Sequence, residues 1–175
     1  MNSIKDSHIK SKDLKINCLI MVISDSLFSL GEKWLEKDKS GKKAQSFLES
    51  KNYNVMDLVV LPDDMMMIRN SIKNNFENDI PNINFLLTIG GTGISKRDVT
   101  IEAVQPLLDK ELPGFGEIFR YETYKKLKSV ALMSRAIAGV KNESLICCLP
   151  GSPNAVEMGL NLIEPEFLHI LNLRK

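Results

Sequence analysis

The chain lacks the excess of positive charge that proteins acting on nucleic acids or membranes usually carry. Its 175 residues contain 23 lysines and arginines against 22 aspartates and glutamates, which gives a formal net charge of +1. Binding to a polyanion or to an anionic membrane favours a basic excess. The composition therefore argues against nucleic acid and against a membrane as the main partner.

Cysteine and histidine are also scarce, with three and two residues respectively. Cys18 lies in one apolar run, Cys147 and Cys148 are adjacent in another, and no C-x-x-C spacing occurs. Neighbouring side chains of a strand point to opposite faces of its sheet. We therefore predict three buried thiols in a reducing compartment, without a disulfide or a metal site. His8 lies in a polar tail and His169 in an apolar stretch, so no histidine-based metal cluster is expected.

Long hydrophobic runs and targeting signals are missing as well. No apolar run reaches the roughly 20 residues that a membrane-spanning helix needs. Residues 1–15 are polar and lack the apolar core of a signal peptide. We predict a flexible polar extension over residues 1–14 and a single soluble, cytoplasmic domain over residues 15–175. A hydrophobic fraction of 43% is enough for the core of one domain of this length.

Apolar runs bounded by proline, glycine and short polar residues predict four strands, at residues 16–23, 54–61, 83–89 and 145–149. Helical spacing predicts helices at about 38–50, 64–76, 100–108, 117–127 and 153–171. Strands that alternate with helices of this length predict an α/β fold, a three-layer sandwich with a mostly parallel central sheet and helices on both sides.

Several segments between these elements carry weaker patterns. The methionines at residues 65–67 are expected to fill the core, and residues 113–116 are expected to separate two helices. Residues 132–138 are ambiguous, and residues 140–144 resemble a hairpin turn. The polar stretch 31–42 contains Trp34 and is expected to be either a solvated loop or a mobile flap.

All four predicted strands end in polar, glycine-rich or proline-rich clusters. These clusters are Ser24-Asp25-Ser26, Pro62-Asp63-Asp64, Gly90-Gly91-Thr92-Gly93 and Pro150-Gly151-Ser152-Pro153. In open parallel sheets, ligands bind beyond the carboxyl ends of the strands. The four coinciding endings therefore predict a ligand site at one edge of the sheet.

The segment of residues 90–93 has two interpretations. With side-chain bulk missing at Gly90, Gly91 and Gly93, successive backbone N–H groups can face inward and bind a phosphate beside Thr92. The alternative is a tight strand-to-helix turn that only needs positive φ. Neither a Walker A motif nor a G-x-G-x-x-G fingerprint is present.

Two aspartates accompany this turn in the predicted site. Asp98 precedes a predicted helix and Asp63 follows Pro62, so each is alternatively a helix cap or a turn residue. Taken together, they place two carboxylates at the edge that carries the phosphate-binding turn, and Mg²⁺ is commonly held by one or two carboxylates plus substrate phosphates. Ser152 before Pro153 fits a helix N-cap, and the same geometry directs free N–H groups at an anion.

A family resemblance is carried by several motifs in order. The stretch T-I-G-G-T-G-I-S-K-R-D-V-T, residues 88–100, resembles the signature of the molybdenum-cofactor-biosynthesis domain, the MogA/MoaB-like family. Further matches are Glu102-Ala103, E-L-P-G-F-G-E at 111–117, Ser134-Arg135-Ala136 and L-P-G-S-P at 149–153. The resemblance covers essentially everything after the N-terminal tail. The short C-terminal part is more similar to the MoaB-like branch.

The resemblance implies the fold of that domain and a molybdopterin adenylyltransferase activity. In such a reaction ATP and Mg²⁺ adenylylate the terminal phosphate of molybdopterin and pyrophosphate is released. The essential aspartates of the family match Asp63 and Asp98, which we assign to Mg²⁺ binding and nucleotide positioning. The first-strand Ser-Asp pair of the family matches Ser24 and Asp25. The nucleotide phosphates would lie on residues 90–93, with Lys96 and Arg97 as phosphate contacts or, as we expect, a solvated pair. Pro150, Gly151 and Ser152 would hold the pterin phosphate.

The resemblance also implies a homotrimer or hexamer and a downstream metal-insertion protein as a partner. The Asp-x-Ser-Gly motif of the family matches residues 38–41, whereas Ser26 stands where relatives often have Arg or Thr, and residues 27–37 form a longer segment. Two other functions remain open. One is a non-catalytic pterin-binding or carrier trimer, and the other is a nucleotide pyrophosphohydrolase on the same fold.

Overall fold

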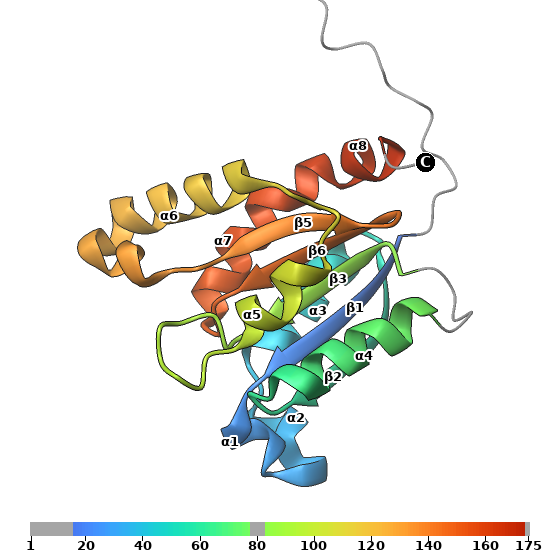
Figure 1. The fold of residues 1–175 in the computed structure, drawn as a ribbon, viewed down its shortest axis with the longest axis vertical. Helices are drawn as coiled ribbons and strands as arrows, with labels where there is room; N and C mark the ends of the chain where they lie inside the picture. Colours follow the sequence, from blue (N-terminus) through green and yellow to red (C-terminus); the bar gives the residue numbers. More distant parts are fainter. Residues whose placement is uncertain (1–15, 78–82, 174–175) are drawn as a thin grey trace, which may run out of the picture.

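The computed structural model describes residues 16–77 and 83–173, so the predicted extension over residues 1–14 lies outside the described residues. A six-stranded sheet forms the middle of the molecule (Figure 1). In spatial order its strands are β2 (Asn54–Leu61), β1 (Asn17–Ile23), β3 (Phe85–Ile89), β6 (Ser144–Leu149), β5 (Ile137–Lys141) and β4 (Lys110–Glu111). The first four run parallel, β5 is antiparallel to β6, and β4 is antiparallel to β5. The mostly parallel sheet predicted from the four apolar runs is confirmed.

Helices cover both faces of this sheet. One face packs against α3 (Ser40–Ser50), α6 (Pro113–Leu127), α7 (Pro153–Ile163) and α8 (Phe167–Asn172), and the other against α4 (Met65–Glu77) and α5 (Thr100–Val104). Figure 1 shows α4 and α5 in front of the sheet and α3 and α7 behind it. The predicted three-layer α/β fold is confirmed. Over residues 16–77 and 83–173 no helix is long and apolar enough to cross a membrane.

The central strands are buried on both faces, which explains their continuous apolar runs. Cys147 belongs to the core cluster on one face of the sheet and Cys148 to the cluster on the other, as their adjacency predicts. All three cysteines are free and buried. Burial raises the pKa of Cys18 and of Cys148 to about 12, so both thiols are protonated and unreactive at neutral pH.

Proline explains most differences between the predicted and the observed helices. Residues 113–116 do not separate two helices but form the first turn of α6, because proline is favoured at the first helical position. Helix α5 ends at Val104, and a 3₁₀ helix that contains Pro106 follows at Gln105–Leu107. The last predicted helix is divided into α7 and α8 by a 3₁₀ turn at Glu164–Glu166, which contains Pro165.

Two further expectations are wrong. The methionines at residues 65–67 do not fill the core, because Met66 is 58% exposed and its two neighbours are exposed as well. Ile68 and Ile72 form the buried stripe of α4 in their place. The stretch 31–42 is not a loop but contains the 3₁₀ helix Gly31–Lys33, the short helix α2 (Trp34–Lys37) and the start of α3. The hairpin predicted at residues 140–144 is confirmed, since Lys141 pairs with Ser144 across a two-residue turn.

Candidate functional site

The carboxyl ends of the four parallel strands meet at one edge of the sheet, as the sequence predicts. The backbone N–H of Ser24, after β1, donates to the carbonyl of Leu61 at the end of β2 over 2.9 Å. The N–H of Gly90, after β3, donates to the carbonyl of Leu149 at the end of β6, also over 2.9 Å. The predicted site residues therefore belong to four neighbouring turns.

Residues 90–93, which we call the glycine turn, have a backbone that requires glycine. Gly90 and Gly91 have φ values of 105° and 61°, in the left-handed region that other residues rarely enter. A Cβ atom at Gly90 would overlap the carbonyl oxygen of Ile23, and one at Gly91 would overlap Oγ1 of Thr100. The tight-turn interpretation of this segment is therefore correct.

The same turn also presents backbone donors. Within residues 16–77 and 83–173, no acceptor takes a hydrogen bond from the N–H groups of Gly91, Thr92 or Gly93. The buried Thr100 fixes the turn, because its N–H donates to the Gly91 carbonyl over 3.0 Å and its Oγ1 to the Gly90 carbonyl over 2.9 Å. Successive N–H groups in such a turn form a concave site for anions. Tight turn and anion site are thus compatible uses of one segment.

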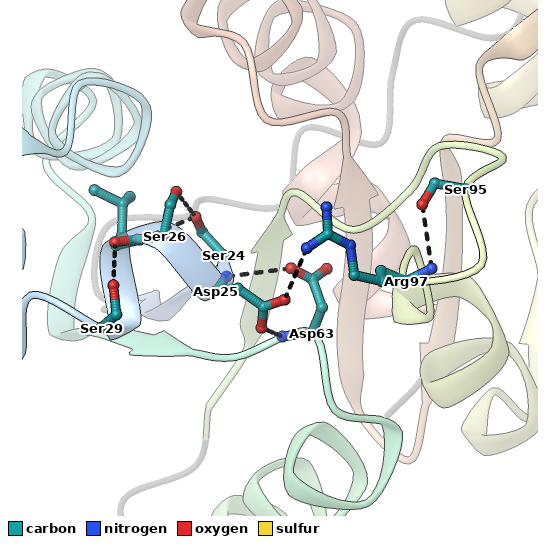
Figure 2. Close-up of polar contacts among 8 residues, drawn as sticks. Ser24, Asp25, Ser26, Ser29, Asp63, Ser95 and Arg97 are labelled. Atoms are coloured by element: carbon teal, nitrogen blue, oxygen red, sulfur yellow. Dashed lines mark hydrogen bonds and ion pairs between the residues drawn. The ribbon is translucent and has the colours of Figure 1, made fainter.

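Asp63 is tied to Asp25 by a reciprocal pair of hydrogen bonds (Figure 2). The N–H of Asp25 donates to Oδ2 of Asp63 over 3.2 Å, and the N–H of Asp63 donates to Oδ1 of Asp25 over 3.0 Å. The first turn of α4 is capped by its neighbour, since Oδ1 of Asp64 accepts the N–H of Met67 over 2.8 Å. The helix-cap interpretation of Asp63 is therefore wrong.

Burial raises the pKa of the Asp63 carboxyl above its ordinary value. The nearby charges of Asp25 and Asp98 raise this pKa further, while the N–H of Asp25 and the charge of Arg97 lower it. The charged form of Asp63 is thus disfavoured in a half-buried place beside two other carboxylates. An additional cation at this position would favour the charged form.

Asp98 does not cap a helix either. The N-cap of α5 is Val99, and no side chain caps that helix end. Oδ2 of Asp98 accepts the N–H of Ser95 over 2.8 Å, which closes the loop that leads from the glycine turn to α5. The carboxylate of Asp98 is therefore held by its own loop and faces back toward the turn, where a Cβ atom at Gly93 would lie 2.9 Å from Oδ2.

Lys96 and Arg97 lie on the outside of this loop. Lys96 is exposed, and the side chain of Arg97 is 82% exposed, as expected for a solvated pair. The Nη1 atom of Arg97 lies 3.9 Å from Oδ2 of Asp25, and Figure 2 shows its guanidinium directed toward Asp25 and Asp63. An ion pair this exposed contributes little to stability.

A cavity of about 670 Å³ opens beside the glycine turn. It is lined by all four residues of the turn, by Asp98, and by Pro150, Gly151 and Ser152 after β6. The other walls come from α6, from the 3₁₀ helix η3 (Lys128–Met133) and from α7. This volume is within the range of small-molecule sites.

The predicted site residues fall into two groups around this cavity. Asp63, Ser24 and Asp25 are not among its lining residues, although Asp63 lies against Gly91 of the glycine turn. Ser24 lines a second cavity of about 280 Å³ together with Asp38 and Ser40. Gly151 borders both cavities, which connects the two groups.

The motif at residues 38–41 supports the turn after β6. Asp38 is buried and its carboxylate accepts the N–H groups of Ser40, Gly41 and Lys42 at the start of α3. Oγ of Ser40 donates to the carbonyl of Gly151 over 2.6 Å. The motif thus joins α3 to the cavity wall, a role that its spacing alone does not reveal.

The turn after β6 has the geometry that its sequence predicts. Ser152 is the N-cap of α7, its Oγ accepts the N–H of Ala155 over 3.2 Å, and Pro153 occupies the first position of the helix. The amino end of an eleven-residue helix therefore faces the cavity.

Sequence reasoning missed several residues of the cavity wall. Lys126, Val130 and Asn154 line the cavity, but no motif marks them. Ser134 belongs to a motif of the family resemblance and lines the cavity too. Lys126 and Val130 come from α6 and η3, which approach the site only after the chain has folded, so spacing carries no signal for them, whereas Asn154 directly follows the predicted turn after β6.

Both aspartates have the oxygen ligands that a hard divalent cation prefers, and both lie against the glycine turn. Oδ1 of Asp63 lies 2.8 Å from the position that a Cβ atom would take at Gly91, two residues from the contact of Asp98 with Gly93. Carboxylate oxygens are preferred ligands of Mg²⁺. Among the described residues, no three His, Cys, Asp or Glu side chains gather into a preformed metal centre.

Comparisons with known proteins agree with this architecture. The family model described as "Probable molybdopterin binding domain" matches residues 19–169. A relative from Staphylococcus carnosus (strain TM300), named molybdenum cofactor biosynthesis protein B, is 39% identical over 173 residues, which cover 96% of each chain. A crystal structure of a molybdenum cofactor biosynthesis protein B has a TM-score of 0.82 at 39% identity and covers 91% of this chain and 96% of that chain. The molybdopterin biosynthesis enzyme MoaB from Thermus thermophilus has a TM-score of 0.78 at 31% identity, covering 90% of this chain and 95% of that one.

The fold and the site define a three-layer α/β protein with a ligand-sized cavity at the carboxyl edge of its sheet. The chain belongs to the MoaB/MogA-type family of molybdenum cofactor biosynthesis proteins.

Proposed function

We propose that this chain is a molybdopterin adenylyltransferase that uses Mg-ATP. The observation that carries this proposal is the position of Asp63 and Asp98, two carboxylates from distant segments that lie against one glycine turn with free backbone donors. Such a turn suits phosphate oxygens, and the carboxylates suit a divalent ion bound to them. An adenylyl transfer needs both a site for phosphate oxygens and a divalent ion.

In the proposed reaction, a phosphate oxygen of molybdopterin attacks the α-phosphorus of ATP. The bond from this phosphorus to the bridging oxygen breaks, and pyrophosphate leaves. Catalysis of such transfers comes mainly from in-line positioning and from stabilisation of charge. A bound Mg²⁺ would neutralise the developing charge on the phosphate oxygens.

The residues of this chain have separate tasks in the proposal. Asp63 and Asp98 orient the metal–nucleotide complex, and the N–H groups of the glycine turn donate to the nucleotide phosphates. Ser24 and Asp25 support the Asp63 side of the site. Pro150, Gly151 and Ser152, with the amino end of α7, hold the phosphate of the pterin in the larger cavity.

Incubation with molybdopterin, Mg²⁺ and ATP, followed by mass detection of the pterin, tests this proposal. Adenylylated molybdopterin together with pyrophosphate is the expected product. Pterin binding without a change in pterin mass would establish a non-catalytic carrier instead. AMP formed from ATP or from a dinucleotide in the absence of pterin would establish a nucleotide pyrophosphohydrolase.

Asp63→Asn is expected to increase stability in ligand-free protein at pH 7. The folded-state pKa of Asp63 is raised above 3.8, so the folded state binds this proton more tightly than the unfolded state does. The stabilisation from protonation is fully present below pH 3.8 and is lost as the pH rises through the folded-state pKa. A neutral asparagine avoids that loss and still accepts the N–H of Asp25.

Urea denaturation of the parent and the Asp63→Asn variant, from pH 3.5 to pH 7 without Mg²⁺, measures this effect. The difference in the free energy of unfolding should grow as the pH rises. A difference that is independent of pH, or one that favours the parent at pH 7, would be inconsistent with the raised pKa.

We also propose that the chain assembles into homotrimers. One face of α6 carries Ile118, Tyr121 and Tyr124 at helical spacing, each more than half exposed in the single chain, and Leu132 of η3 is exposed as well. A group of exposed apolar side chains on one face of a helix is typical of a surface that another subunit covers. Light scattering should give three times the mass of the 19.7 kDa chain, or six times if two trimers pair. A monomer at micromolar concentration would contradict this prediction.

We propose a downstream metal-insertion protein as a further partner, because the adenylylated pterin would need a protein that inserts the metal.

A further inference from the structure

Arg135 connects both ends of the loop that carries Asp98. It lies between η3 and β5, and its Nε donates to the carbonyl of Thr92 over 3.3 Å. Its Nη2 donates to the carbonyl of Asp98 over 3.2 Å. One guanidinium group therefore binds both ends of the loop, at Thr92 in the glycine turn and at Asp98.

Glu102 on α5 holds this guanidinium in place. Both Nη atoms of Arg135 contact its carboxylate, and the Nη2–Oε2 distance is 3.3 Å. A two-pronged arginine–carboxylate contact fixes the plane of the guanidinium as well as its position. The hydrogen bond from Arg135 lowers the pKa of Glu102 below its usual range, so the pair stays charged at neutral pH.

We propose that Arg135 is a positioning residue for the nucleotide site. It fixes the distance between the glycine turn and Asp98. The N–H groups of the turn and the carboxylate of Asp98 can then bind the same phosphate–metal group. The inference rests on the proposed function only for the identity of that ligand. The contacts themselves predict how the ligand-free loop behaves.

The loop amides provide a test that does not depend on activity. The N–H of Ser95 donates to Asp98 Oδ2, and the N–H of Asp98 donates to the Ser95 carbonyl. In Arg135→Gln, these amides should exchange with deuterium about tenfold faster, the factor expected when a charge-assisted hydrogen bond is lost. Arg135→Lys should not restore protection, because one ammonium group cannot span Thr92, Asp98 and Glu102 together.

Arg69 of α4 provides a matched control, because it also donates to α5. It donates to the carbonyls of Glu102 over 2.7 Å and Ala103 over 3.3 Å, and within residues 16–77 and 83–173 it makes no hydrogen bond or ion pair with the loop. Arg69→Gln should therefore lower the thermal midpoint, as Arg135→Gln does, but without faster exchange of Ser95 and Asp98. In the adenylyl-transfer assay, kcat should fall about 10²-fold for Arg135→Gln, as a misplaced reacting group predicts, and stay near the parent value for Arg69→Gln.

The outcomes separate this inference from the proposed function. Unchanged exchange in Arg135→Gln, or equal acceleration in Arg69→Gln, would overturn the positioning role whatever the activity. Faster exchange confined to the Arg135 variants supports the positioning role even if the parent protein makes no adenylylated pterin, a result that would refute only the proposed function. Faster exchange with a parent-like kcat would refute the link between the loop and the reaction.

Discussion

Asp98→Asn is expected to lower kcat for adenylyl transfer by about 10²–10³-fold while the protein remains folded, the size of effect seen when one group that stabilises transition-state charge is removed. Asparagine keeps the shape of the side chain and still accepts the N–H of Ser95, so the loop retains its hydrogen bond. It loses the negative charge that the proposed metal ion requires. The loss should therefore appear in the chemical step rather than in the fold.

Asp64→Asn is the control for this variant. Asp64 is an exposed aspartate beside Asp63, and its carboxylate caps α4. Asparagine is also a good N-cap, so both stability and kcat should remain close to the parent values. If Asp98→Asn folded, assembled and reacted at the parent rate, Asp98 would have no part in catalysis.

Gly90→Ala is expected to destabilise the protein by about 3 kcal/mol or more, the sum of a strained backbone and an overpacked contact. Gly90 has a φ of 105°, and a Cβ atom there would overlap the carbonyl oxygen of Ile23. That oxygen belongs to the backbone at the end of β1, so it cannot rotate away as the end of a side chain would. For a protein of this length, the thermal midpoint should fall by roughly 6–12 °C.

Gly114→Ala is the matched control for Gly90→Ala. Gly114 lies in the first turn of α6, and no atom from outside its own helical turn lies within 4 Å of the position of its added Cβ. An alanine there should be neutral or stabilise by up to about 1 kcal/mol, because alanine favours a helix more than glycine does. Equal thermal midpoints for the two variants would contradict the described geometry of the glycine turn.

The sheet could largely be predicted from the sequence because three of its four parallel strands, β1, β3 and β6, are buried on both faces. A nearly continuous apolar run such as residues 16–23 then indicates a buried strand. The antiparallel edge was harder to predict. β4 consists of two exposed residues, Lys110 and Glu111, whose pairing with β5 leaves no hydrophobic pattern. Its position depends on contacts with Gly139 and Val140, which no local rule supplies.

The part of the candidate site that follows the strand ends could be predicted from the sequence. The glycine turn, Asp63 and Asp98 come together because parallel strands share one carboxyl edge. Their local roles could not be predicted, because capping depends on backbone geometry. Asp64 rather than Asp63 caps α4, and Asp98 closes its own loop. Arg135 reaches that loop across 37 positions of sequence, so only the fold reveals its contacts.

The position of a bound divalent ion is the most direct test of this account. A crystal structure with Mn²⁺ and a non-hydrolysable ATP analogue would locate the ion by its anomalous scattering. We predict Mn²⁺ in contact with the carboxylates of Asp63 and Asp98, and phosphate oxygens that accept the N–H groups of Gly91, Thr92 and Gly93. A nucleotide bound with its phosphates away from this turn, or an ion that contacts neither aspartate, would contradict the proposed site.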